Sequence, residues 1–178
     1  MVQGRPPPDL ALESVSSANL EALRALNRTI FPINYTAKTY ADILACGPVT
    51  QLALSQGRVI GAIACRLEQT AECIQLYIIT LGVLAPYRRC GIAAILLSTV
   101  LDYVRHELPE VSRAQLHVHT INTEAITLYR GAGFEAAEEL PGYYRRLDPP
   151  DALLLRLKLQ PAPDTHDSEL RMDRAILN

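Results

Sequence analysis

The stretch LGVLAPYRRCGIAA, residues 81–94, decides how this 178-residue chain is interpreted. It begins as the end of an apolar strand, passes through a loop with two arginines and opens an apolar helix. Gly91 and Ala93 let a ligand approach the backbone, and the first amides of a helix have no partner inside it. The positive end of the helix dipole lies there too, so the stretch predicts a site for a diphosphate. A tight turn with solvated arginines explains the local spacing equally well.

Other phosphate-binding motifs do not match this loop. No Gly-Lys-Ser/Thr follows it, which excludes a Walker P-loop, and no GxGxxG follows the first predicted strand, which excludes a Rossmann fingerprint.

The bulk composition predicts one soluble domain. The chain is 49% hydrophobic and 20% charged, and its net charge of −2 gives no basic footprint for nucleic acid or an anionic membrane. Its four cysteines show no CxxC and no zinc spacing. No apolar run resembles a secretory signal or a membrane span. We expect a protein of the cytoplasm, with the nucleus as a second compartment.

Hydrophobic periodicity predicts the order of elements on both sides of the loop. The expected strands are 9–15, 49–55, 58–67, 73–84, 113–120, 134–139 and 152–159. The expected helices are one capped by Ser16 or Ser17 and reaching Ile30, then 36–45, 91–105 and 122–131. This order predicts a mixed α+β sheet in a domain over 9–159, preceded by a Pro-rich leader (1–8) and followed by a polar tail (160–178).

Strand 73–84 carries two further expectations. Gly82 inside it indicates a bulge or a close backbone approach. Strict alternation places Tyr77, Ile79 and Leu81 on one face, opposite Leu76, Ile78 and Thr80. Taken alone, Tyr77 is explained at least as well as a core tyrosine.

Two histidines share one face of strand 113–120. His117 and His119 are spaced by two, so periodicity cannot choose between them. A metal pair is the alternative, but no third ligand lies near them in sequence.

The loop then carries a family resemblance. Residues 88–93, RRCGIA, match the R/Q-x-x-G-x-G/A motif of the GNAT superfamily of N-acetyltransferases, with Ala93 in a place often held by glycine. The chain resembles this superfamily over 9–159, and within it the N-alpha-acetyltransferases of the NatE (San) type. The matching stretches are FPINY (31–35), LYIITLG (76–82), LAPYRR (84–89), LHV (116–118), NTEAI (122–126) and YY (143–144).

The resemblance implies the GNAT fold: a mixed, mostly antiparallel sheet of about seven strands flanked by about four helices and splayed between its two central strands. Gly131 departs from the family, because a glycine there predicts early fraying of helix 122–131.

The resemblance also implies acetyl-CoA as cosubstrate, with no metal. Tyr77 and His117 would hold a water between them that removes the amine proton, and a weak base suffices because an α-amine has a pKa near 8. The expected acetyl-CoA contacts are Leu81, Val83, Arg88, Arg89, Cys90, Gly91, Ile92, Ala93, Ala94, Asn122 and Tyr129. Leu81 and Val83 would act through their backbones, Gly82 allowing the approach, and Tyr129 would act on the leaving sulfur. Asn122 is explained equally well as a helix N-cap.

Two aromatic segments imply the acceptor site. The expected peptide contacts are Phe31, Pro32, Ile33, Tyr35, Tyr77, Tyr143 and Tyr144. In the family such segments enclose a protein N-terminus, with an apolar pocket for an initiator Met. The alternative is that Phe31 and Ile33 only join two helices.

The implied activity is acetylation of the α-amine of a retained Met followed by a residue such as Leu. The alternatives are an N-ε-lysine acetyltransferase and a weakly active acetyl-CoA-binding subunit of the NatA complex. The implied partners are protein N-terminal peptides and the auxiliary and catalytic subunits of NatA, through them the ribosome, with no direct nucleic acid and no membrane.

Overall fold

The computed structural model of the chain describes residues 4–31 and 34–159. Within those ranges the strands are β1 (Ala11–Ser14), β2 (Gln51–Ser55), β3 (Arg58–Gln69), β4 (Ile74–Val83), β5 (Val111–His119), β6 (Glu135–Leu140) and β7 (Ala152–Lys158). The helices are α1 (Leu20–Ile30), α2 (Ala37–Ala45), α3 (Ile92–Glu107) and α4 (Thr123–Gly131), with short 3-10 turns η1 (Gly47–Val49) and η2 (Ala85–Tyr87). The predicted mixed α+β architecture is confirmed. The leader is described only from Gly4 onward, and the predicted tail lies outside the described residues.

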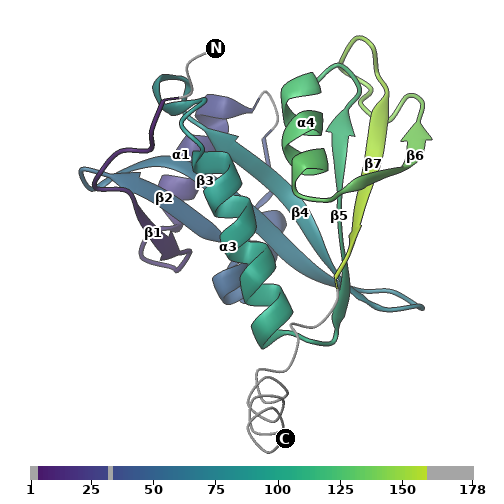
Figure 1. Cartoon of the computed structure of the whole chain (residues 1–178), viewed down its shortest axis with the longest axis horizontal. Helices are drawn as coiled ribbons and strands as arrows, with labels where there is room; N and C mark the ends of the chain where they lie inside the picture. The colour runs from purple at the N-terminus through teal and green to yellow at the C-terminus, as the bar shows by residue number, and fades with distance from the viewer. Residues whose placement is uncertain (1–3, 32–33, 160–178) are drawn as a thin grey trace, which may run out of the picture.

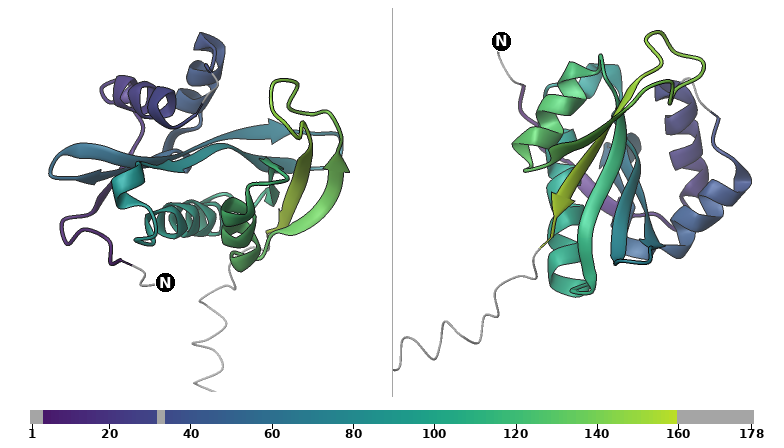
Figure 2. Two further views of the ribbon diagram at one scale, coloured as in Figure 1. Left: turned by 90° about the horizontal axis from the view of Figure 1, so that it is seen from above. Right: turned by 90° about the vertical axis from the view of Figure 1, so that its right-hand side faces the viewer.

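One sheet organises the molecule, with the strand order β1-β2-β3-β4-β5-β7-β6. All neighbouring strands are antiparallel except β4 and β5, which are parallel. Figures 1 and 2 show α1 and α2 on one face of the sheet and α3 and α4 on the other. Within the described residues, no helix is long and apolar enough to cross a membrane.

The sheet splits between its central strands. β4 and β5 pair only from Ile74 to Tyr77 and from Val111 to Gln115. Beyond these residues both strands continue, but each pairs only with its outer neighbour, β3 or β7. The predicted splay is therefore present, and it begins directly after Tyr77.

Two apolar cores hold the layers together. On one face α3 buries a stripe of side chains at helical spacing, among them Leu97, Leu101 and Val104. On the other face Leu23 and Leu26 of α1 pack with Ile43 of α2 against β2 and β3. Each fully buried side chain of this size contributes about 1.5–3 kcal/mol, so the two cores fix the helices that border the split.

A bulge in β4 contradicts the strict alternation expected for this strand. Ala64 of β3 pairs with Thr80 and its neighbour Cys65 pairs with Ile78, so Ile79 is an extra residue. An extra residue reverses which face the following side chains occupy. Ile79 packs with the α1–α2 core but Leu81 with the α3–α4 core. The prediction that Tyr77 and Leu81 share a face is therefore wrong.

Two helix ends also differ from expectation. The N-cap of α1 is Asn19, whose side chain accepts a hydrogen bond from the Ser16 amide, so neither Ser16 nor Ser17 caps this helix. The predicted fraying of α4 is absent, because the N–H of Ala132 still bonds the carbonyls of Leu128 and Tyr129.

Candidate active site

A cavity of about 1030 Å³ lies at the split between β4 and β5. It runs from the start of α3, past the two strands, to the segments that follow α1 and β6. Most of the predicted site residues line it: Phe31, Tyr35, Tyr77, Leu81, Val83, Arg88, Arg89, Gly91, Ile92, Ala93, Ala94, His117, Asn122, Tyr129, Tyr143 and Tyr144. The fold thus brings together in one cavity residues from five separate segments.

The start of α3 forms one end of this cavity. Gly91 precedes the helix with a φ of 79°, a left-handed conformation that favours glycine. The first bond of the helix runs from the Ile95 amide to the Gly91 carbonyl, at 3.0 Å. The amides of Ile92, Ala93 and Ala94 therefore have no acceptor within the helix. This geometry fits a diphosphate such as that of coenzyme A.

Arg88 and Cys90, two expected acetyl-CoA contacts near the start of α3, differ in how they lie. Arg88 folds back, and its Nε donates to the carbonyl of Val83 at 3.1 Å, which ties the loop to the end of β4. Cys90 does not line the cavity, and its thiol lies 3.5 Å from the Arg88 carbonyl. The expected contact between Cys90 and acetyl-CoA stays a prediction.

Tyr77 and His117 meet across the split. The hydroxyl of Tyr77 and Nδ1 of His117 lie 2.8 Å apart, which is a direct hydrogen bond. The expected water between these two side chains has no room on that line. Burial lowers the pKa of His117 and raises that of Tyr77. At neutral pH the imidazole is therefore uncharged and able to accept a proton, while the phenol keeps its own.

The segment between β6 and β7 covers His117 from the other side. The ring of Tyr143 stacks on His117 with centroids 4.4 Å apart and planes 12° apart. The hydroxyl of Tyr144 lies 3.4 Å from the His117 carbonyl, and burial raises its pKa to about 12. His119 lies at the edge of the cavity, where its Nε2 bonds the carbonyl of Pro149. His117 thus takes part in the site, whereas His119 anchors the covering segment.

An aromatic wall stands opposite, at the end of α1. Phe31 and Tyr35 contact each other edge to face, with centroids 6.4 Å apart. A Cβ at Gly82 would lie 3.0 Å from Cζ of Phe31 and 3.2 Å from two atoms of Ile30. Gly82 is therefore where α1 approaches β4, which is a packing reason for the glycine. Gly82 also lines the cavity, and the expected approach of a pantetheine arm stays a prediction. Pro32 and Ile33 lie outside the described residues.

α4 supplies two more lining residues. The side chain of Asn122 accepts a hydrogen bond from the Ala125 amide at 3.2 Å, so Asn122 is an N-cap that also faces the cavity. Tyr129 is buried against Phe134, and burial raises the pKa of its hydroxyl. Tyr129 also lines the cavity, where this hydroxyl can serve as a donor that stays protonated.

Some lining residues were not expected from the sequence. Arg66 of β3 lies opposite Tyr77 in the strand register and places its guanidinium 4.8 Å from the centre of the Tyr77 ring. Leu147, from the covering segment, closes part of the same cavity. An arginine directly after the apolar run 59–65 is a signal that could have identified Arg66, whereas Leu147 has no sequence signal. Among the described residues no group of three or more His, Cys, Asp or Glu side chains could hold a metal ion.

Comparisons with known proteins all point to the same family of acetyltransferases. Residues 20–134 match the model of the "Acetyltransferase (GNAT) family". The chain is 38% identical over 151 residues to N-alpha-acetyltransferase 50 of Danio rerio, covering 85% of this chain and 89% of that protein. It is 35% identical over 151 residues to the Drosophila melanogaster protein "Probable N-acetyltransferase san", covering 85% and 82%. Arabidopsis thaliana Naa50, solved with the bisubstrate analogue CoA-Ac-MVNAL, superposes with a TM-score of 0.78 at 40% identity, covering 84% of this chain and 98% of that one.

Proposed function

Because this chain belongs to the GNAT family of acetyltransferases, we propose that it transfers the acetyl group of acetyl-CoA to the α-amine of protein N-termini. The proposed acceptor is a retained initiator Met followed by a residue such as Leu. The observation that carries this proposal is the Tyr77–His117 pair, which lies between the start of α3 and the aromatic wall.

The proposed chemistry needs a neutral amine, a polarised carbonyl and a protonated leaving group. As the amine nitrogen bonds the acetyl carbon, the bond from that carbon to sulfur breaks, and one proton moves from nitrogen to sulfur. The direct hydrogen bond between Tyr77 and Nδ1 of His117 prepares a relay in the tautomer with hydrogen on Nε2, in which the phenol donates to Nδ1. Tyr77 passes its proton to Nδ1 while a water, placed between the amine and this pair, takes the amine proton and returns one to the phenol. His117 then releases its extra proton to solvent and the leaving thiolate takes one up from solvent, so that the net transfer is from nitrogen to sulfur. Tyr129 lines the cavity and in this proposal donates a hydrogen bond to the sulfur.

The lining of the peptide end supports an α-amine acceptor. Phe31, Tyr35, Tyr143 and Tyr144 are aromatic, and the described lining carries no carboxylate on that side. Glu124, the carboxylate that does line the cavity, belongs to the first turn of α4. A lysine acceptor has a pKa near 10.4 and needs more help to become neutral than an α-amine near 8. The site offers an uncharged, weak base, which suits the α-amine.

The proposed preference for Met rests on the aromatic wall and on the relative from Arabidopsis. That protein was solved with an analogue whose peptide begins Met-Val, and it is 40% identical to this chain. Phe31 and Leu147 both line the cavity and would provide apolar surface for an unbranched side chain.

Two peptides separate this proposal from lysine acetylation. One begins Met-Leu with a free α-amine, and its twin is α-blocked and carries a lysine. We expect kcat/KM to be at least about 100-fold higher for the first, because an acceptor of higher pKa is less often neutral at pH 7. If the blocked peptide is the better substrate, the chain is a lysine acetyltransferase. If neither peptide reacts although acetyl-CoA binds, the chain is better explained as a weakly active acetyl-CoA-binding subunit.

We further propose association with the auxiliary and catalytic subunits of NatA, and through them with the ribosome, in the cytoplasm and the nucleus. The support is the sequence resemblance to the NatE type. Mixing the purified chain with NatA on a size-exclusion column tests the association, and separate elution at micromolar concentration would contradict it.

A further inference from the structure

We propose that Gln75 is a positioning residue, which sets the geometry of the Tyr77–His117 pair by fixing the point at which β4 and β5 separate. This inference rests on the proposed function, since it assigns that pair to the reaction. Gln75 lies two residues before Tyr77 on β4 and is 3% exposed. A buried amide needs partners for its donors and its acceptor.

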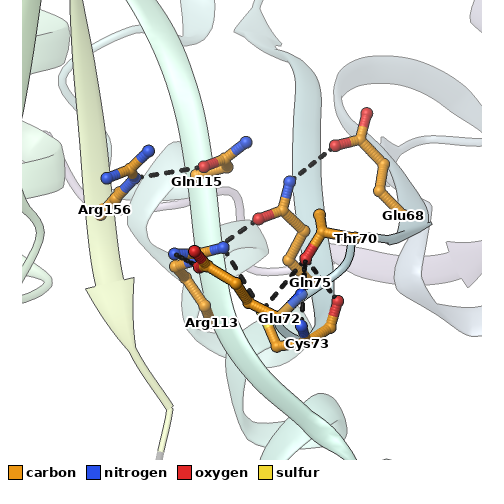
Figure 3. A network of polar contacts seen from close by, with 8 residues as sticks. All are labelled: Glu68, Thr70, Glu72, Cys73, Gln75, Arg113, Gln115 and Arg156. Carbon is orange, nitrogen blue, oxygen red and sulfur yellow. Dashed lines mark hydrogen bonds and ion pairs between the residues drawn. The ribbon is translucent and has the colours of Figure 1, made fainter.

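Gln75 finds those partners on both neighbouring strands. Its Nε2 donates to Glu68 of β3 at 2.8 Å, and its Oε1 accepts from Nε of Arg113 of β5 at 3.1 Å. Glu68 and Arg113 are also its directly opposite partners in the two strand registers. The three side chains form one polar rung across β3, β4 and β5 (Figure 3).

The rung is anchored at both outer ends. Glu68 pairs with Arg66, whose guanidinium lies over the ring of Tyr77. Arg113 reaches the thiol of Cys73 with Nη2 at 3.3 Å and the carboxylate of Glu72 with Nη1 at 3.8 Å. Gln75 is therefore the central link of a network that contacts Tyr77 from the β3 side and holds β5 on the other.

The position of this rung gives it a function. β4 and β5 make their last pair at Tyr77 and Gln115, two residue pairs beyond Gln75 and Arg113. His117 follows Gln115 by two residues, already past the end of the pairing. The distance between the Tyr77 hydroxyl and His117 thus depends on how firmly the strands are joined just before they part. Charge-assisted hydrogen bonds are about twice as strong as neutral ones, and the rung carries a charged group at each end.

Exchanging the carboxylate of Glu68 and the amide of Gln75 between their two positions tests the proposal. Gln75→Glu alone brings two carboxylates together, and Glu68→Gln alone leaves two amide donors facing each other. In the double variant the new amide at position 68 accepts from Arg66 and donates to the new carboxylate at position 75, which accepts from Arg113. Every bond of the rung is restored at unchanged net charge.

We expect each single variant, and Gln75→Met, to lower kcat on a Met-Leu peptide by about 10- to 100-fold, as misplacement of reacting groups does. KM for acetyl-CoA should stay within about twofold, since the start of α3 is unaffected. The double variant should recover kcat to within about threefold of the wild type. Gln115→Met is the matched control. Gln115 pairs with Tyr77 of β4 through its backbone, which the substitution keeps, whereas its side chain accepts from Nε of Arg156 of β7 at 3.4 Å.

A second readout does not depend on activity. The ¹⁵N shift of His117 Nδ1 reports its hydrogen bond to Tyr77, and it should move toward that of a free imidazole in Gln75→Met and return in the double variant. Unchanged kcat and an unchanged shift in Gln75→Met, or a double variant no better than the singles, would overturn the proposal. If the wild type does not acetylate the peptide, the proposed function fails, while the imidazole shift still decides whether Gln75 positions the pair.

Discussion

Tyr77 and His117 act on each other rather than as independent groups. They come from strands joined in parallel, and their 2.8 Å contact exists only because the pairing stops at Tyr77. Tyr143 stacks on the imidazole and helps to bury it, so the same contacts that orient His117 also keep it uncharged. At this scale, position and protonation state have a common cause.

Removing either group should slow turnover without loss of the cosubstrate. We expect Tyr77→Phe and His117→Ala each to lower kcat by about 10²- to 10⁴-fold, the usual worth of proton transfer by a positioned side chain. The Kd of acetyl-CoA, measured by calorimetry, should change little. Tyr103→Phe and His106→Ala are the controls, because both residues belong to α3 and neither lines the cavity. Normal turnover in both site variants would remove the pair from the mechanism.

The pH profile should follow the acceptor amine more than His117. Since burial lowers the pKa of His117 below its usual 6.5, its basic form is lost only as the pH falls below that value. An α-amine becomes neutral near pH 8, so kcat/KM should rise up to about pH 8 and then level off. Tyr77 should cause no alkaline loss up to about pH 10, because its pKa is raised above the usual value of about 10. A decline in kcat/KM between pH 8 and 10 would contradict this assignment.

Among the elements, β4 and α1 meet at Gly82, which lies against Phe31 of the proposed peptide end. Gly82→Ala would place a methyl group 3.0 Å from Phe31, and overpacking of this kind typically costs about 1–3 kcal/mol. We expect a lower free energy of unfolding and a higher KM for the peptide, because Phe31 must move. Urea unfolding and peptide kinetics check both effects.

Gly131 supplies the matched control for that substitution. It closes α4 at an ordinary φ, and a Cβ there would meet no atom within 4 Å. Gly131→Ala should therefore be neutral or stabilising by about 0.5–1 kcal/mol, since alanine loses less backbone entropy than glycine. If both variants behave alike, the contact between Gly82 and Phe31 does not control the peptide end.

Helices and strands were predicted well where the sequence pattern lies within one segment. They were predicted poorly where the structure depends on a neighbouring strand or turn. The loop before α3 and the stripe on its buried face follow from spacing along one segment. The bulge at Ile79 does not, because it is defined by the two residues of β3 that face it. The start of α1 was predicted too early for a related reason. The side chain of Asn19 accepts a hydrogen bond from the Ser16 amide, so residues 16–19 form a turn and the helix begins only after Asn19.

The site shows the same division. Sequence resemblance selected His117 over His119, and the structure supports this by bonding His119 to Pro149. No pattern along the chain could give the direct contact between Tyr77 and His117, the folding back of Arg88, or the rung through Gln75. The Tyr77–His117 contact and the bond between Arg113 and Gln75 join residues 40 and 38 positions apart. The folding back of Arg88 onto Val83 spans only five positions and depends on how the turn between them folds.

For the whole molecule, one cavity extends from the start of α3 to the proposed peptide end. Acetyl-CoA should therefore stabilise the entire fold, by about 2.7 kcal/mol at 100 times its Kd. Pantetheine lacks the diphosphate that the start of α3 would bind, so at the same concentration it should raise Tm much less. Equal shifts of Tm with both compounds would contradict the anion site at α3.

The central claim, an acetyltransferase for protein N-termini, is tested most directly on a single peptide that offers both amines. A Met-Leu peptide with a free α-amine and an internal lysine is incubated with the chain and acetyl-CoA, and tandem mass spectrometry locates the first acetyl group. We predict that it lies on the α-amine of Met, with the lysine unmodified at that stage. An acetyl group found first on the lysine would contradict the account.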